Sequence, residues 1–105
     1  MRIDISVCDD APNPALEHAL RALAARLFRP HTARVEALSL RLTPFSRPDA
    51  ARVWRCTLRV QGEAVGTLYL DGVGPMPHRV AEHLLEDTVS LVGKGAGAMG
   101  GAAAV

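Results

Sequence analysis

The feature that most constrains the fold is a two-residue alternation in the segment VWRCTLRV, residues 53–60. One parity carries apolar side chains that can build a core: Trp54, Cys56, Leu58 and Val60. The other parity carries Val53, Arg55, Thr57 and Arg59. Because successive side chains of a strand point to opposite faces, the segment predicts a strand with one buried and one exposed face. The exposed face would present two arginines and a threonine.

Three further segments alternate in the same way. Together with residues 52–60, they predict a four-stranded sheet with strands at 2–8, 34–43 and 64–70. The turn between the last two strands, QGEA, is short and contains Gly62, which favours an antiparallel hairpin. Loops are expected at DDAPNP, PFSRPDA and DGVGPMP, with Asp9 and Asp10 placed to favour the dipole of the helix that follows.

Leucines and alanines at helical spacing predict two helices, at residues 14–28 and 77–92. Asn13 is a suitable N-cap, with Pro14 at the first helical position, and Gly93 would end the second helix. The predicted fold class is α+β, in the order β-α-β-β-β-α, with two helices packed on one face of a four-stranded sheet. Residues 1–92 would form one domain, followed by a flexible Gly/Ala-rich tail at 93–105. The other face of the sheet would be open, and Arg41 has the parity to lie on it.

The charge balance excludes strong non-specific attraction to nucleic acid, because 12 basic and 11 acidic residues leave a net charge of +1. Eleven of the basic residues are arginine, which contacts phosphate bidentately but can also reflect GC-rich coding. Cys8 and Cys56 are expected to be reduced core thiols. With no segment resembling a signal peptide or a membrane span, we expect a cytoplasmic protein.

The motifs of enzymes and metal sites are missing from the sequence. It contains no nucleotide-binding, nucleophile-elbow or zinc-protease signature, and GKGAGAMGG lacks the spacing of a phosphate-binding loop. His78 and His83 are five residues apart and share a helix face poorly, so no metal site is expected. With these motifs missing, no cofactor or small-molecule substrate is expected either. Few aromatic residues are available for base stacking, which favours contact with the backbone of a folded RNA.

Several segments resemble the ribosome hibernation-promoting factor and ribosome-associated translation inhibitor family, in its short, single-domain form. MRIDISV followed by NPALEHALRALAARL looks like the first strand and helix of that family, RVWRCTLRVQGEAVGTLYLDG like its central hairpin, and MPHRVAEHLLEDTVSLV like its closing helix. The resemblance implies binding to the small ribosomal subunit, in the channel for messenger and transfer RNA, and inhibition of translation during stress or stationary phase. By their places on these elements, the arginines expected to contact ribosomal RNA are Arg21, Arg26, Arg29, Arg34, Arg41, Arg55, Arg59 and Arg79.

The second helix departs from the pattern of that family, whose members usually carry a basic helix there. Glu82, Glu86 and Asp87 would repel phosphate. This leaves open an alternative, in which the same fold is a protein-binding module or a homodimer that does not bind ribosomes. The exposed sheet face or a free edge strand would then take the partner, and the oligomeric state stays open.

Overall fold

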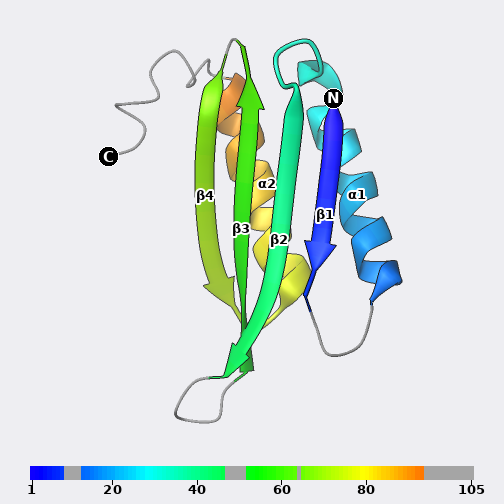
Figure 1. Ribbon diagram of the computed structural model, residues 1–105, viewed down its shortest axis with the longest axis vertical. Coiled ribbons are helices and arrows are strands. Elements are labelled where there is room, and N and C mark those ends of the chain that lie inside the picture. Colours follow the sequence, from blue (N-terminus) through cyan, green and yellow to red (C-terminus); the bar gives the residue numbers. More distant parts are fainter. Residues whose placement is uncertain (9–12, 47–51, 64, 94–105) are drawn as a thin grey trace.

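A four-stranded mixed sheet and two helices make up the fold, which confirms the predicted α+β class. The computed structural model describes residues 1–8, 13–46, 52–63 and 65–93. Its elements in chain order are β1 (Arg2–Val7), α1 (Pro14–Phe28), the 3-10 turn η1 (Arg29–His31), β2 (Ala37–Ser46), β3 (Arg52–Gly62), β4 (Gly66–Gly74) and α2 (Pro77–Gly93). The strands lie in the order β1-β2-β3-β4, with β1 parallel to β2 and the other pairs antiparallel. Both helices lie on one side of the sheet, behind it in Figure 1.

The first helix begins and ends where the sequence predicts. The Asn13 side chain accepts a hydrogen bond from the backbone N–H of Leu16 at 3.1 Å, with Pro14 at the first helical position. The second helix begins at Pro77 as predicted and includes Gly93 as its last residue. Asp9, Asp10 and residues 94–105 of the expected tail lie outside the described residues.

Two strands, β4 and β2, differ most from their predicted bounds, and β3 continues to Gly62, two residues beyond its predicted end. β4 continues through Asp71–Gly74, a segment predicted as a loop because of its two glycines. Gly74 serves packing against α2, since a Cβ there would lie 2.7 Å from Cγ2 of Val80. β2 begins at Ala37 instead of residue 34 and continues to Ser46. Pro44 is tolerated there because β1 pairs with β2 only as far as Leu42, so on that side Pro44 has no described strand to bond.

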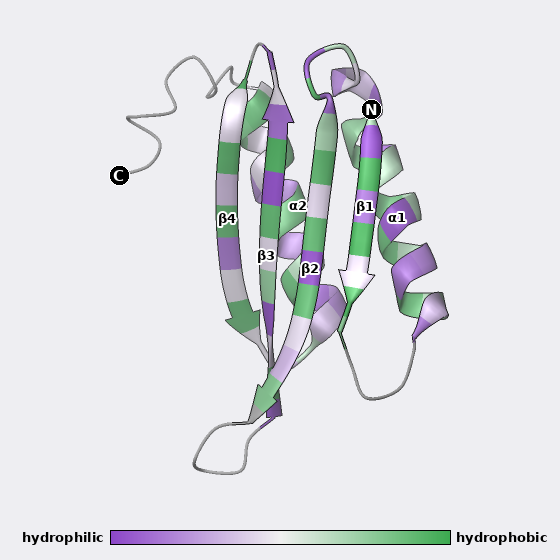
Figure 2. Ribbon diagram, viewed as in Figure 1, coloured by the Kyte–Doolittle hydropathy of each residue, from purple (hydrophilic) through white to green (hydrophobic). Residues whose placement is uncertain are grey.

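The core fills the space between the helices and one face of the sheet. It contains the predicted face of β3, from Trp54 to Val60, together with leucines of β2 and both helices. Figure 2 shows the alternation of hydrophilic and hydrophobic residues along β3. Phe28, at the end of α1, is fully buried and so is not an exposed aromatic. Thr88 is buried in α2, where its hydroxyl donates to the Leu84 carbonyl oxygen at 2.8 Å.

Helix α1 also protects the outer edge of β1. Glu17 accepts a hydrogen bond from the backbone N–H of Val7 at 3.1 Å, and Arg21 donates one to the Ile3 carbonyl oxygen at 2.9 Å. These two backbone groups of β1 therefore have partners within the protein and are not available to pair with a strand of another chain. No helix within the described ranges is long and apolar enough to cross a membrane.

Candidate nucleic-acid interface

Three of the predicted arginines meet on the open face of the sheet. The strand register places three rows across β2, β3 and β4: Ser39–Arg59–Tyr69, Arg41–Thr57–Asp71 and Thr43–Arg55–Val73. Arg41 is thus a diagonal neighbour of both Arg55 and Arg59, and all three are exposed. The sequence predicted that these side chains share the open face. Their adjacency depends on the register, which the structure supplies.

The charges on this face are unevenly paired. Arg55 forms an ion pair with Asp71, with 3.1 Å between Nη2 and Oδ2, and Arg2 pairs with Asp4 at 3.3 Å. Among the described residues, no carboxylate pairs with Arg41 or Arg59. This leaves two positive charges on neighbouring strands of the open face without a described carboxylate partner, which favours the binding of an anion there.

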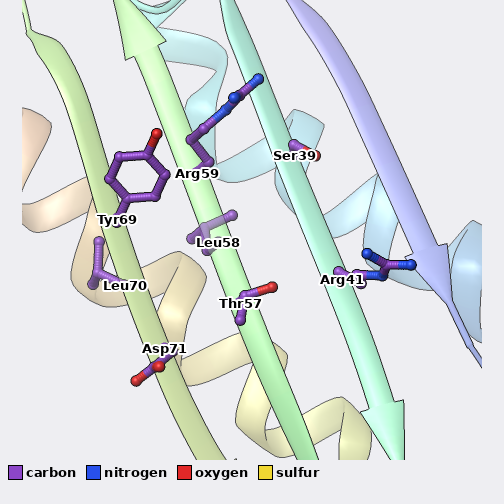
Figure 3. Close-up of a pocket in the computed structure, with 8 residues that line it drawn as sticks. All are labelled: Ser39, Arg41, Thr57, Leu58, Arg59, Tyr69, Leu70 and Asp71. Carbon is purple, nitrogen blue, oxygen red and sulfur yellow. The ribbon is translucent and has the colours of Figure 1, made fainter.

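Two adjoining depressions form what we call the sheet trough. One, of about 650 Å³, is lined on the open face by Ser39, Arg41, Thr57, Arg59, Tyr69 and Asp71. The other, of about 920 Å³, is lined by Cys8, Arg41, Thr43, Phe45, Arg55, Thr57, Asp71 and Val73. Because they share Arg41, Thr57 and Asp71, they form one continuous surface. Figure 3 shows Arg59 reaching from β3 toward β2, Arg41 reaching from β2 toward β1, and the Tyr69 ring beside Arg59.

The two cysteines have different surroundings, and the expectation of two core thiols is wrong for Cys8. Cys56 is buried, and burial raises the pKa of its thiol to about 12. Cys8 follows β1, is partly exposed and lines the sheet trough. Its pKa is lowered, first by the hydrogen bond from Arg41, whose Nε lies 3.5 Å from Sγ, and then by Ser6, whose hydroxyl lies at 3.7 Å.

The other five predicted arginines lie elsewhere. Arg26 and Arg29 line a groove of about 430 Å³ between α1 and α2, together with His78 and Glu82. Arg79 lies beside the junction of β4 and α2. This groove and the sheet trough are on opposite faces of the sheet, so the eight arginines do not form one surface.

Two of these five have structural partners. Arg21 bonds the edge of β1, as described above. Arg34 donates to the Val92 carbonyl oxygen at 3.0 Å, which occupies an acceptor at the carboxyl end of α2. These contacts give both side chains a role in the fold, and we leave them out of the candidate interface.

Asp71 and Cys8 line the sheet trough, although neither was expected there from the sequence. Asp71 has the same parity as Tyr69, and extending the predicted strand by one residue beyond residue 70 would have placed it on the open face. Cys8 was assigned to the core from its residue type. Within the described ranges, no three His, Cys, Asp or Glu side chains gather as metal ligands would.

Solved structures share this fold. A ribosomal subunit interface protein from Coxiella burnetii superposes with a TM-score of 0.68 and 12% identity, over 90% of this chain and 96% of the other. The N-terminal domain of Protein Y from Thermus thermophilus superposes with a TM-score of 0.65 and 14% identity, over 88% and 96%. No protein-family model and no curated protein matches the sequence. The chain therefore has the fold of a ribosomal subunit interface protein and of the Protein Y N-terminal domain, the fold that its sequence resemblance predicted.

Proposed function

We propose that this protein is a cytoplasmic, non-enzymatic ribosome-binding factor. In this proposal residues 1–92 act as one domain that binds ribosomal RNA of the small subunit, occupies the channel for messenger and transfer RNA, and inhibits translation during stress or stationary phase. The chain shares its fold with a ribosomal subunit interface protein, and its sequence resembles the hibernation-promoting factors.

The observation that carries the proposal is the exposed arginine group of the sheet trough, Arg41, Arg55 and Arg59. Guanidinium groups bind phosphate oxygens bidentately, and phosphate contacts account for much of the affinity of proteins for RNA. Arg41 and Arg59 are the stronger candidates because their charges are not neutralised by a described carboxylate. The acidic residues of α2 that departed from the family pattern lie on the helix side of the sheet, away from this trough.

Co-sedimentation with purified small ribosomal subunits tests the proposal. We expect stoichiometric binding at roughly 50 mM salt and a marked loss at roughly 200 mM, because phosphate contacts release counterions. The protein should also inhibit translation in a cell-free extract and compete with messenger RNA for the subunit. If no binding occurs even at the lower salt concentration, the proposal is wrong.

A second candidate function is self-association through β4. Within the described residues, no strand pairs with the outer edge of β4. Val73 of β4 and Met76, which follows the strand, are 50% and 57% exposed. The edge of β1, in contrast, is occupied by Glu17 and Arg21. Sedimentation equilibrium distinguishes the two functions, because a dimer whose stability is independent of salt and of ribosomes supports the second one.

A further inference from the structure

We propose that the Tyr69 end of the sheet trough binds one unpaired nucleotide of a single-stranded RNA segment, with its base stacked on Tyr69 and its flanking phosphates on Arg41 and Arg59. This inference deepens the proposed function by naming the kind of RNA that the site accepts. A folded duplex, recognised through its backbone alone, is the competing possibility.

The exposure of Tyr69 is the first observation. This side chain is 73% exposed, the highest value among the large hydrophobic residues described as exposed. It lies directly across from Arg59 in the register of β3 and β4, and the ring stands beside the Arg59 side chain, whose guanidinium group extends away toward β2 (Figure 3). An aromatic ring placed this way contributes little to the core, but it offers a face on which a base can stack.

Charge is the second observation. Both described carboxylates on this face, Asp4 and Asp71, are paired with arginines other than Arg41 and Arg59. A phosphate would therefore bind toward Arg41 and Arg59 and away from Asp71. Since Asp71 is two residues from Tyr69 on the same face of β4, its carboxylate lies on the side of the base, where it can accept hydrogen bonds from base amino groups.

The size and lining of the depression fit a nucleotide. Its volume of about 650 Å³ lies within the range of sites for small organic ligands. Ser39 and Thr57 place two hydroxyls on its floor, between the two arginines (Figure 3). Hydroxyls can donate to and accept from the ribose 2′-OH, the group that distinguishes RNA from DNA.

The arrangement favours an unpaired base over a duplex. In A-form RNA the bases are stacked and paired, and proteins reach mainly phosphates and 2′-hydroxyls. Only an unstacked base can present its face to Tyr69. Because aromatic residues are few, and Tyr69 is the aromatic residue that lines this end of the trough, we expect one stacked nucleotide there.

Fluorescence anisotropy with two labelled RNAs tests the inference. One is an unstructured single strand of about ten nucleotides, and the other is a duplex of the same length. We compare the wild type with Tyr69→Leu, which keeps apolar volume but removes the ring, and with Tyr69→Phe, which keeps the ring. Since the side chain is exposed, both variants should fold, as circular dichroism can verify.

We expect the wild type to prefer the single strand, Tyr69→Leu to weaken single-strand binding roughly tenfold, and Tyr69→Phe to retain it. Duplex binding should be unchanged in both variants. Replacing Arg59 with Gln should instead lower the slope of log affinity against log salt by about 0.7, as loss of one phosphate contact on a single strand predicts. Equal single-strand affinities for wild type and Tyr69→Leu would overturn the inference, as would a preference for the duplex.

Co-sedimentation of the same variants with small subunits separates this inference from the proposed function. If the wild type binds subunits, and Tyr69→Leu binds both subunits and single strands as well as the wild type does, the nucleotide site is wrong and the proposed function stands. If the wild type fails to bind subunits yet binds the single strand through Tyr69, the site is correct and the ribosomal function is wrong.

Discussion

Cys8 and Cys56 show how strongly the face of the sheet determines side-chain chemistry. Cys56 points into the core, where burial disfavours the thiolate. Cys8 lies on the trough side, where the hydrogen bond from Arg41 favours the thiolate form of Cys8 and lowers its pKa. Because the thiolate is the nucleophile, the two residues should react with alkylating reagents over different ranges of pH.

Alkylation by iodoacetamide, followed residue by residue with mass spectrometry, should show this difference. Cys8 in the folded protein should reach its half-maximal rate at a lower pH than Cys8 in the denatured protein, since its folded pKa is lowered. Cys56 should stay unmodified until the protein unfolds. In Arg41→Met the profile of Cys8 should move to higher pH. Identical profiles for Cys8 in folded and denatured protein would contradict the assignment of the Arg41 bond.

Parity predicted the face of most strand residues, although Val53, on the parity expected to be exposed, is buried. Long-range partners could not be predicted. Parity alone placed Arg41, Arg55 and Arg59 on the open face. It could not reveal that Arg21 bonds Ile3, which is 18 residues away, or that Arg34 bonds Val92, which is 58 residues away. Such partners depend on how elements pack, and two arginines that looked available for RNA therefore prove to have structural contacts.

At the scale of elements, α1 both covers the core and closes the edge of β1. The bond from the Val7 N–H to Glu17 is partly buried and involves a charged acceptor. We expect Glu17→Ala to lower the free energy of unfolding by about 1 kcal/mol. Urea denaturation measures this change, with His18→Ala as a control because His18 is exposed on the same helix. Equal losses in the two variants would mean that the bond adds nothing beyond helix propensity.

The end of β3 depends on a glycine for a different reason. A Cβ at Gly62 would overlap the carbonyl oxygen of Arg34, which is backbone and cannot rotate away. We therefore expect Gly62→Ala to lower the free energy of unfolding by about 2 kcal/mol or more. Gly72→Ala is the matched control, because its Cβ would meet Leu84 at an ordinary 3.6 Å, so its stability should change by less than about 0.5 kcal/mol. If Gly62→Ala is as stable as the control, the backbone approach at Arg34 is looser than described.

The success of the sequence prediction differed between helices and strands for a physical reason. The ends of α1 are set by local signals, Asn13 with Pro14 and then Pro30, and were predicted correctly. The end of β4 is set by packing, because Gly74 leaves room for Val80 of α2, and both Gly72 and Gly74 remain paired with β3. The two glycines, which predicted a loop, are residues of β4. Because the predicted strand ended at residue 70, Asp71 was not expected on the open face.

For the whole molecule, the main question is which of its two arginine surfaces binds RNA. The sheet trough carries Arg41 and Arg59 without described acidic partners, whereas the groove between the helices has Glu82 beside Arg26 and Arg29. The more positive local potential of the trough favours it. A test on Arg34 would be ambiguous, since its loss also frees the Val92 carbonyl group at the end of α2.

Two charge-reversal variants of equal net charge resolve this question. Arg41→Glu with Arg59→Glu alters the trough, and Arg26→Glu with Arg29→Glu alters the groove, so any general effect of lowered protein charge is the same in both. We expect the trough variant to lose most of its affinity for small subunits, and to lower the slope of log affinity against log salt by about 1.4 to 1.8, for two phosphate contacts. The groove variant should keep its slope and bind nearly as well as the wild type. The reverse result would place the interface on the helices, and equal losses would mean that RNA contacts both faces.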